Sequence, residues 1–112
     1  MLDWNQYHAQ LMSRIGELSK LSPGTVQGFS TLSAAGEQTG KLDARTRELI
    51  SLAVAVTTRC DGCITVHAKE AVKAGATQEE IAEALGVAVA MNAGAALVYS
   101  ARALDAVSNE LA

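Results

Sequence analysis

The chain of 112 residues has few aromatic residues, a single proline and no excess of basic residues. Aromatic side chains make up only 4% of it, so the interior must be filled by aliphatic and small side chains, among them 21 alanines. Alanine and leucine favour helices, and one proline, Pro23, leaves almost the whole chain free to be helical. These scarcities predict an all-α fold.

The charge balance excludes one class of partner. The net charge is −3 and the isoelectric point is near 5.3, whereas nucleic-acid-binding proteins carry clustered basic surface. The first residues lack the basic start and apolar run of a signal peptide. We expect a cytoplasmic protein with no nucleic-acid partner, folded as one domain over residues 1–112.

One segment has the length of a membrane-spanning helix. Residues 84–101 carry no charge, and 18 apolar residues can cross a bilayer. The segment also contains Asn92 and Ser100 and is rich in alanine and glycine, so it would insert poorly. We predict that the protein does not enter a membrane.

Apolar periodicity, caps and helix breakers predict about six helices. Asp43 can cap one helix, Thr77 and Glu80 match a capping box at the start of another, and Gly40 and Gly75 are natural stops. The expected helices cover residues 2–21, 23–38 and 44–58, then a fourth from the cysteine pair to residue 74, and a fifth from Thr77, which residues 92–94 divide from a sixth ending near residue 109.

Small residues recur every fourth position in the fifth predicted helix. They are Ala82, Gly86, Ala90 and Gly94, which give one helix face almost no side-chain bulk. Another backbone can approach such a face closely. A tight helix pair within the chain is the favoured interpretation, and a subunit interface is the alternative.

The only two cysteines, Cys60 and Cys63, are three residues apart. A disulfide between such close positions closes almost no loop and adds little stability, so the pair suits reversible redox chemistry better than a structural role. In the cytosol a CxxC pair is more often catalytic or metal-binding than permanently oxidised. The first turn of a helix would also stabilise the thiolates, because its unpaired N–H groups face outward.

Two further residues can move protons near these thiols. His67 follows Cys63 by four residues, so the two side chains share a helix face and the imidazole can act as a base for the thiol. Glu48 lies on the preceding predicted helix and reaches the thiols only if the two helices fold back antiparallel. In that arrangement its carboxylate can orient the imidazole or relay a proton.

The constellation Glu48, Cys60, Cys63 and His67 resembles the core motif of the AhpD-like alkylhydroperoxidases, within the carboxymuconolactone decarboxylase superfamily. The similarity extends through Glu-Leu-Ile-Ser-Leu-Ala-Val-Ala at residues 48–55, the His-Ala pair at 67–68 and Ala-Gly-Ala-Thr-Gln-Glu-Glu-Ile at 74–81. It covers about residues 42–103. The first forty residues fit the family only as extra helices.

The resemblance implies an oligomeric all-α peroxidase with an antioxidant role, assembled as a homotrimer or homohexamer, with no cofactor and no metal. Cys63 would be the catalytic peroxidatic thiol, and Cys60 the resolving thiol nearer the solvent. His67 and Glu48 would form the catalytic proton relay. The substrate would be a hydroperoxide, and an external dithiol, such as a lipoylated carrier or a thioredoxin-like protein, would reopen the disulfide.

One departure concerns the residues between the cysteines. Some family members have a histidine there, whereas this chain has Asp61 and Gly62. The negative charge of Asp61 should raise the pKa of the neighbouring thiols. Asp61 and Gly62 are therefore the residues at which this chain is expected to differ from its relatives, in peroxidase strength or in another property of the thiols.

Four other interpretations concern the same residues. A zinc site built from Cys60, Cys63, His67 and Glu48 is chemically allowed, and so is a non-catalytic helical assembly protein whose thiols only sense redox state. A thioredoxin-like fold is disfavoured, because the chain has no βαβ pattern. The decarboxylase branch of the superfamily works without the cysteine pair, so the presence of both thiols argues against it.

Overall fold

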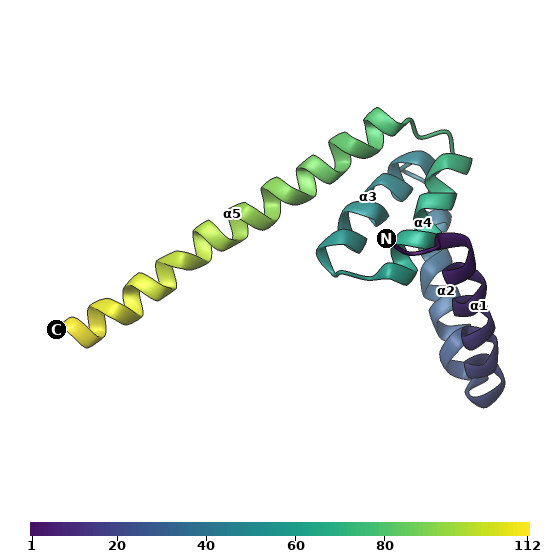
Figure 1. Cartoon of the computed structure of the whole chain (residues 1–112), viewed down its shortest axis with the longest axis horizontal. Helices are drawn as coiled ribbons and strands as arrows, with labels where there is room; N and C mark the ends of the chain where they lie inside the picture. Colours follow the sequence, from purple (N-terminus) through teal and green to yellow (C-terminus); the bar gives the residue numbers. More distant parts are fainter.

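The computed structural model describes residues 1–112 and contains five helices and no strand (Figure 1). The helices are α1 (Trp4–Leu21), α2 (Pro23–Thr39), α3 (Ala44–Thr57), α4 (Asp61–Lys73) and α5 (Gln78–Leu111). The all-α class predicted from the composition is confirmed.

The helix ends follow the predicted caps. The Asp43 carboxylate accepts the Thr46 N–H at 2.8 Å at the start of α3, and Thr77 and Glu80 form the reciprocal capping box of α5. Gly40 and Gly75 follow α2 and α4 with φ values of 67° and 90°. This left-handed conformation is strained for residues with a side chain, which explains why glycines stand at these two helix ends.

The expected division of the C-terminal region into two helices is wrong, because α5 continues unbroken for 34 residues. The Asn92 side chain donates to the Ala88 carbonyl at 2.7 Å and to the Thr57 hydroxyl at 3.0 Å, so its NH2 group is hydrogen-bonded while the residue stays in the helix. Gly94 weakens a helix by about 1 kcal/mol relative to alanine. The alanine-rich sequence around it outweighs that cost.

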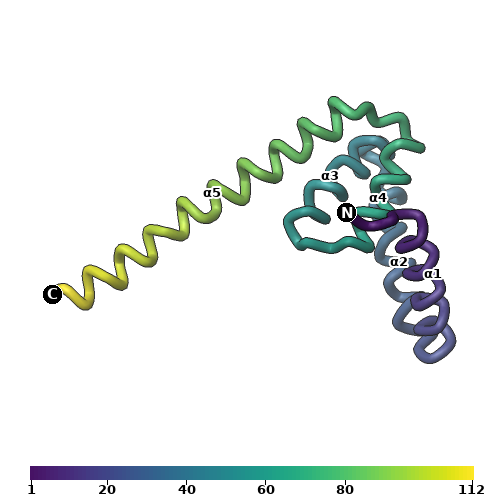
Figure 2. Tube along the Cα trace, in the orientation of Figure 1, coloured from purple at the N-terminus to yellow at the C-terminus, as the bar shows by residue number.

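The helices are arranged as a small centre from which two segments project (Figures 1 and 2). Helices α3 and α4 pack against each other in the centre, and the start of α5 packs against α3. Helices α1 and α2 form a hairpin whose first helix packs on α4. The hairpin and the end of α5 project in different directions.

Very little of the chain is buried. Five residues are buried, and none of them lies in α1 or α2; they are Leu52, Ala55, Thr65, Ala71 and Ala88. The radius of gyration is 18.6 Å, whereas a compact domain of this length has about 13 Å. The accessible surface is 8608 Å², against about 5,800 Å² expected for a folded monomer of this mass.

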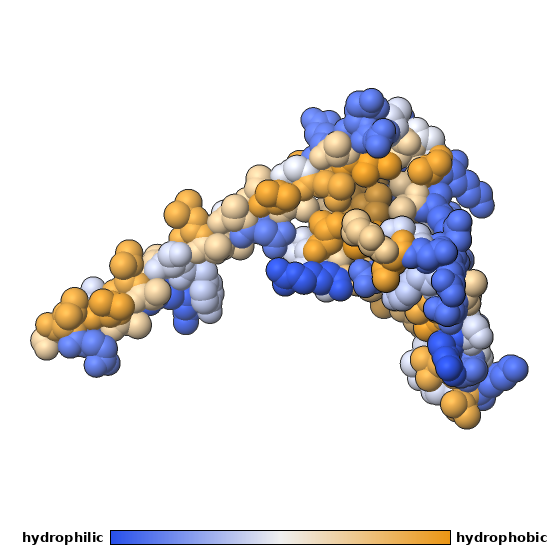
Figure 3. Space-filling model, in the orientation of Figure 1, coloured by the Kyte–Doolittle hydropathy of each residue, from blue (hydrophilic) through white to orange (hydrophobic).

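α5 carries more of the exposed large apolar side chains than any other helix (Figure 3). Length and composition alone would let this helix cross a membrane, and only 6% of its most apolar 18-residue window is buried in the chain. Ala82, Gly86 and Ala90 are exposed, and nothing lies within 4 Å of a Cβ built on Gly86 or Gly94. The favoured prediction of a tight helix pair within the chain is therefore wrong.

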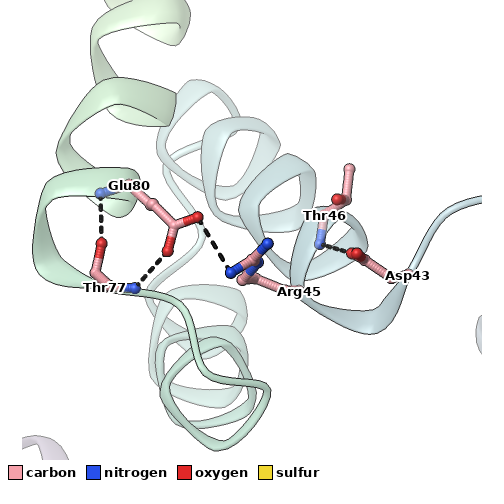
Figure 4. A network of polar contacts seen from close by, with 5 residues as sticks. All are labelled: Asp43, Arg45, Thr46, Thr77 and Glu80. Atoms are coloured by element: carbon pink, nitrogen blue, oxygen red, sulfur yellow. Dashed lines mark hydrogen bonds and ion pairs between the residues drawn. The ribbon is translucent and has the colours of Figure 1, made fainter.

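The N-termini of α3 and α5 meet in a network of polar contacts (Figure 4). Arg45 pairs with Glu80 at 3.5 Å, which joins the two capped helix starts. Backbone hydrogen bonds from Thr46 and Thr77 lower the pKa of Asp43 and Glu80, respectively. The nearby charge of Arg45 lowers both further.

This network predicts a specific loss of stability in acid. A carboxylate whose pKa is lower in the folded state stabilises the fold above its unfolded pKa, near 4, and that stabilisation is lost as pH falls through the folded pKa. Glu80→Gln keeps the capping geometry without the charge. We expect its melting temperature to fall less than that of the wild type between pH 6 and 3, measured by circular dichroism. If the melting temperatures of the two proteins fall equally between pH 6 and 3, the loss of stability in acid does not come from the Glu80 carboxylate.

Candidate active site

The two cysteines lie at the start of α4 and form a disulfide, with their Cα atoms 5.2 Å apart. Cys60 is the N-cap of α4, and its sulfur accepts the Cys63 N–H at 3.1 Å. When the pair is reduced, this hydrogen bond and the helix N-terminus stabilise a thiolate on Cys60. Both cysteines are half-buried, so exposure does not make one of them the outer thiol.

A short turn connects α3 to Cys60 at the start of α4. Arg59 has a φ of 53°, the one left-handed residue of the chain that is not glycine, and the Cys60 N–H donates to the Ala55 carbonyl at 3.1 Å. The left-handed conformation costs a residue with a Cβ about 1 kcal/mol. The turn therefore holds Cys60 at the helix start at some expense in stability, as is common beside functional sites.

Glu48 and His67 meet across the α3–α4 contact. Glu48 Oε2 lies 2.6 Å from His67 Nδ1, and the two side chains are 21% and 32% exposed. With an ionised carboxylate, Nδ1 carries a proton and donates it in the hydrogen bond, which leaves Nε2 as the acceptor. The predicted contact between Glu48 and His67, which required α3 and α4 to lie antiparallel, is therefore present.

An apolar groove runs beside the disulfide. It has a volume of about 520 Å³, and Cys60, Cys63 and His67 form one part of its lining. The rest comes mainly from the α1–α2 hairpin, with Leu11, Met12, Ile15, Leu18, Val26 and Phe29 as its apolar residues. The two predicted thiols, Cys60 and Cys63, and the predicted base, His67, therefore face one shared groove.

The contribution of α1 to this site was not predicted from the sequence. A Cβ on Gly62 would lie 2.9 Å from Leu11 Cδ2 and 3.9 Å from the Tyr7 hydroxyl, so α1 crosses directly over the residues between the cysteines. Glycine at this position gives α1 room to approach the active-site turn. The amphipathic pattern of residues 2–21 revealed the helix but not the surface that it covers.

The four predicted residues do not form a ready metal cluster. No group of three or more His, Cys, Asp and Glu side chains is arranged to hold an ion. The two sulfurs are bonded to each other, and the Glu48 carboxylate is directed at His67. Zinc binding would need the disulfide to be reduced and the side chains to move.

An all-α fold that presents a close cysteine pair at a helix start, with a carboxylate–imidazole pair beside it, defines a helical thiol protein. Residues 23–106 match the Carboxymuconolactone decarboxylase family. The match covers most of the chain, and the chain belongs to this family, within the AhpD-like superfamily.

Similar proteins extend over nearly the same length. An uncharacterized protein of Haemophilus influenzae is 53% identical over 95% of this chain and 94% of its own length. "Uncharacterized protein 4 in cox locus" of Paracoccus denitrificans is 43% identical over 80% of this chain and 81% of its own. A crystal structure of a carboxymuconolactone decarboxylase family protein from Legionella pneumophila has a TM-score of 0.75 and 39% identity over 95% of both chains.

Proposed function

We propose that the protein is a thiol peroxidase that reduces hydroperoxides through the Cys60–Cys63 pair. The observation that carries the proposal is the hydrogen bond of 2.6 Å between Glu48 and His67, beside a groove that His67 shares with both cysteines. A disulfide needed only for structure would not require an oriented base. The family name alone does not supply this activity.

The first step is attack of the Cys63 thiolate on one peroxide oxygen. The sulfur supplies an electron pair to form an S–O bond, the O–O bond breaks, and the second oxygen leaves as an alkoxide. His67 Nε2 first takes the thiol proton and then returns it to the alkoxide, so the products are a sulfenic acid and an alcohol. Glu48 keeps the imidazole oriented and stabilises its charged form.

The second step closes the disulfide. The Cys60 sulfur attacks the sulfenic sulfur, the S–O bond breaks, and the proton of the Cys60 thiol leaves with the hydroxide as water. The Cα separation of 5.2 Å permits this bond without moving the backbone. An external dithiol, a lipoylated carrier or a thioredoxin-like protein, then reduces the pair and becomes a disulfide itself.

The protein acts in the cytoplasm as a homotrimer or homohexamer, without nucleic acid and outside the membrane. The surface that exceeds the expected value for a monomer, about 2,800 Å² per chain, supports assembly, since obligate interfaces bury areas of this order. Copies of the chain, rather than lipid, would then cover α5.

Turnover tests the proposal directly. Reduced protein is mixed with an organic hydroperoxide and an excess of dithiothreitol, and peroxide loss is followed with time. We expect many equivalents of peroxide to be consumed per protein, with none beyond background after both thiols have been alkylated. Equal rates with native and alkylated protein would exclude the peroxidase and favour the non-catalytic redox sensor.

A further inference from the structure

The end of α5 is an arm that touches nothing in its own chain. Beyond Gly94, every residue of α5 is exposed, and residues 95–111 are defined here as the C-terminal arm. Leu97, Leu104 and Leu111 are 77%, 70% and 81% exposed and recur every seven residues. This is the spacing at which helices pack along a shared seam.

The leucine seam lies on the side of α5 opposite to its contact with α3. Ala88, buried at that contact, precedes Leu104 by sixteen residues, which places the two about 160° apart around the helix axis at 100° per residue. Ala90, seven residues before Leu97, continues the seam toward the exposed small residues. The seam is thus free for its whole length.

The groove beside the disulfide is the second uncovered apolar surface. Its walls on α1 and α2 include Ile15, Leu18 and Phe29, which are 40%, 43% and 68% exposed. A two-helix hairpin with no buried residue is not stable by itself, because helices of this length depend on tertiary packing. The hairpin therefore needs a cover, as the arm does.

We infer that the C-terminal arm of one copy lies in the groove of a second copy and closes it over Cys60, Cys63 and His67. The arm of 17 residues is about 26 Å long, and α1, with 18 residues, is about 27 Å long, so the two surfaces match in length. A contact between two different surfaces of the chain generates a closed ring when the rotation that relates neighbouring copies closes, and the proposed trimer or hexamer contains such a ring.

The consequence for chemistry is a redox site made of two subunits. Leucines from the arm would exclude water beside the thiols, and apolar surroundings strengthen the hydrogen bond between Glu48 and His67. The inference rests on the proposed assembly, but its test measures access to the thiols and not turnover. Failure of the peroxidase proposal would therefore leave it untouched.

Leu104→Glu and Ala106→Glu form a matched pair of variants. Both add one carboxylate to the arm, but Ala106 lies eighteen residues after Ala88 and so on the opposite side from the seam. The reduced proteins are labelled with a polyethylene-glycol maleimide, with iodoacetamide as a small reagent that corrects for changes in thiol reactivity. Light scattering gives the mass of the assembly, and circular dichroism checks the helix content.

We expect the wild type and Ala106→Glu to be oligomers whose thiols react with the large reagent at least about tenfold more slowly than in Leu104→Glu, because the arm must leave before the reagent enters. Wild-type labelling should also accelerate on dilution, a result that needs no variant. An oligomer dissociated by Leu104→Glu with unchanged relative labelling would overturn the inference and indicate pairing of arms with each other. A monomeric wild type that binds lipid vesicles would overturn it as well.

Discussion

Replacing Cys63 with serine is expected to reduce peroxide consumption to the rate measured without protein, because no sulfenic acid can form on the catalytic sulfur. Cys60→Ser should still consume one equivalent of hydroperoxide and then stop, since Cys63 is oxidised but has no intramolecular thiol to resolve it. The measurement is peroxide loss in a single-turnover mixture, followed by trapping of sulfenic acid with dimedone.

The two serine variants also serve as controls for each other. Both remove the same disulfide from the same helix start, so the loss of the cross-link is common to the two variants. The opposite pattern, with the single turnover retained by Cys63→Ser and lost in Cys60→Ser, would reverse the roles of the thiols. That reversal is worth testing, because Cys60 is the N-cap and its sulfur accepts a backbone N–H.

Glu48→Gln is expected to lower kcat/KM for the hydroperoxide by about 100-fold, the usual size of a contribution from general acid–base catalysis. The glutamine keeps the size of the side chain but cannot stabilise a charged imidazole. Reduced Glu48→Gln protein should also react at a rate that depends differently on pH, because His67 no longer has an anionic partner. Stopped-flow measurement of the first oxidation step gives both quantities.

Glu70→Gln is the control for this variant. Glu70 lies on α4 three residues after His67 but is exposed, and the same change in charge there should leave the rate unchanged. A Glu48→Gln variant with normal rate and pH profile would mean that the pair of Glu48 and His67 only joins α3 to α4. In that case the melting temperature alone would fall.

Local signals in the sequence were sufficient to predict most of the helices. The caps at Asp43 and Thr77 and the stops at Gly40 and Gly75 lie where the structure begins and ends helices. The error was at Asn92 and Gly94, which favour a break by propensity. The Asn92 side chain instead bonds to Ala88 and Thr57, and the second of these contacts is tertiary and invisible to local pattern.

The candidate site was predictable in part for the same reason. Spacing placed His67 on the face of Cys63, and the return of α4 along α3 explains why Glu48 reaches the imidazole. No local sequence pattern indicated that α1 would cross over Gly62 or that the end of α5 would project away from the rest of its chain. Both features depend on contacts between residues that are far apart in the sequence. The position of α5 also depends on the proposed contacts with other copies of the chain.

In the proposed mechanism, Cys60 and Cys63 divide the reduction of one hydroperoxide between them. Intact-mass spectrometry of the reduced protein after one equivalent of an organic hydroperoxide tests it most directly. We expect the loss of two hydrogens as the disulfide forms, together with one equivalent of alcohol, at a rate that falls in Glu48→Gln. Both thiols persisting after the hydroperoxide has been added, with no alcohol formed, would contradict it.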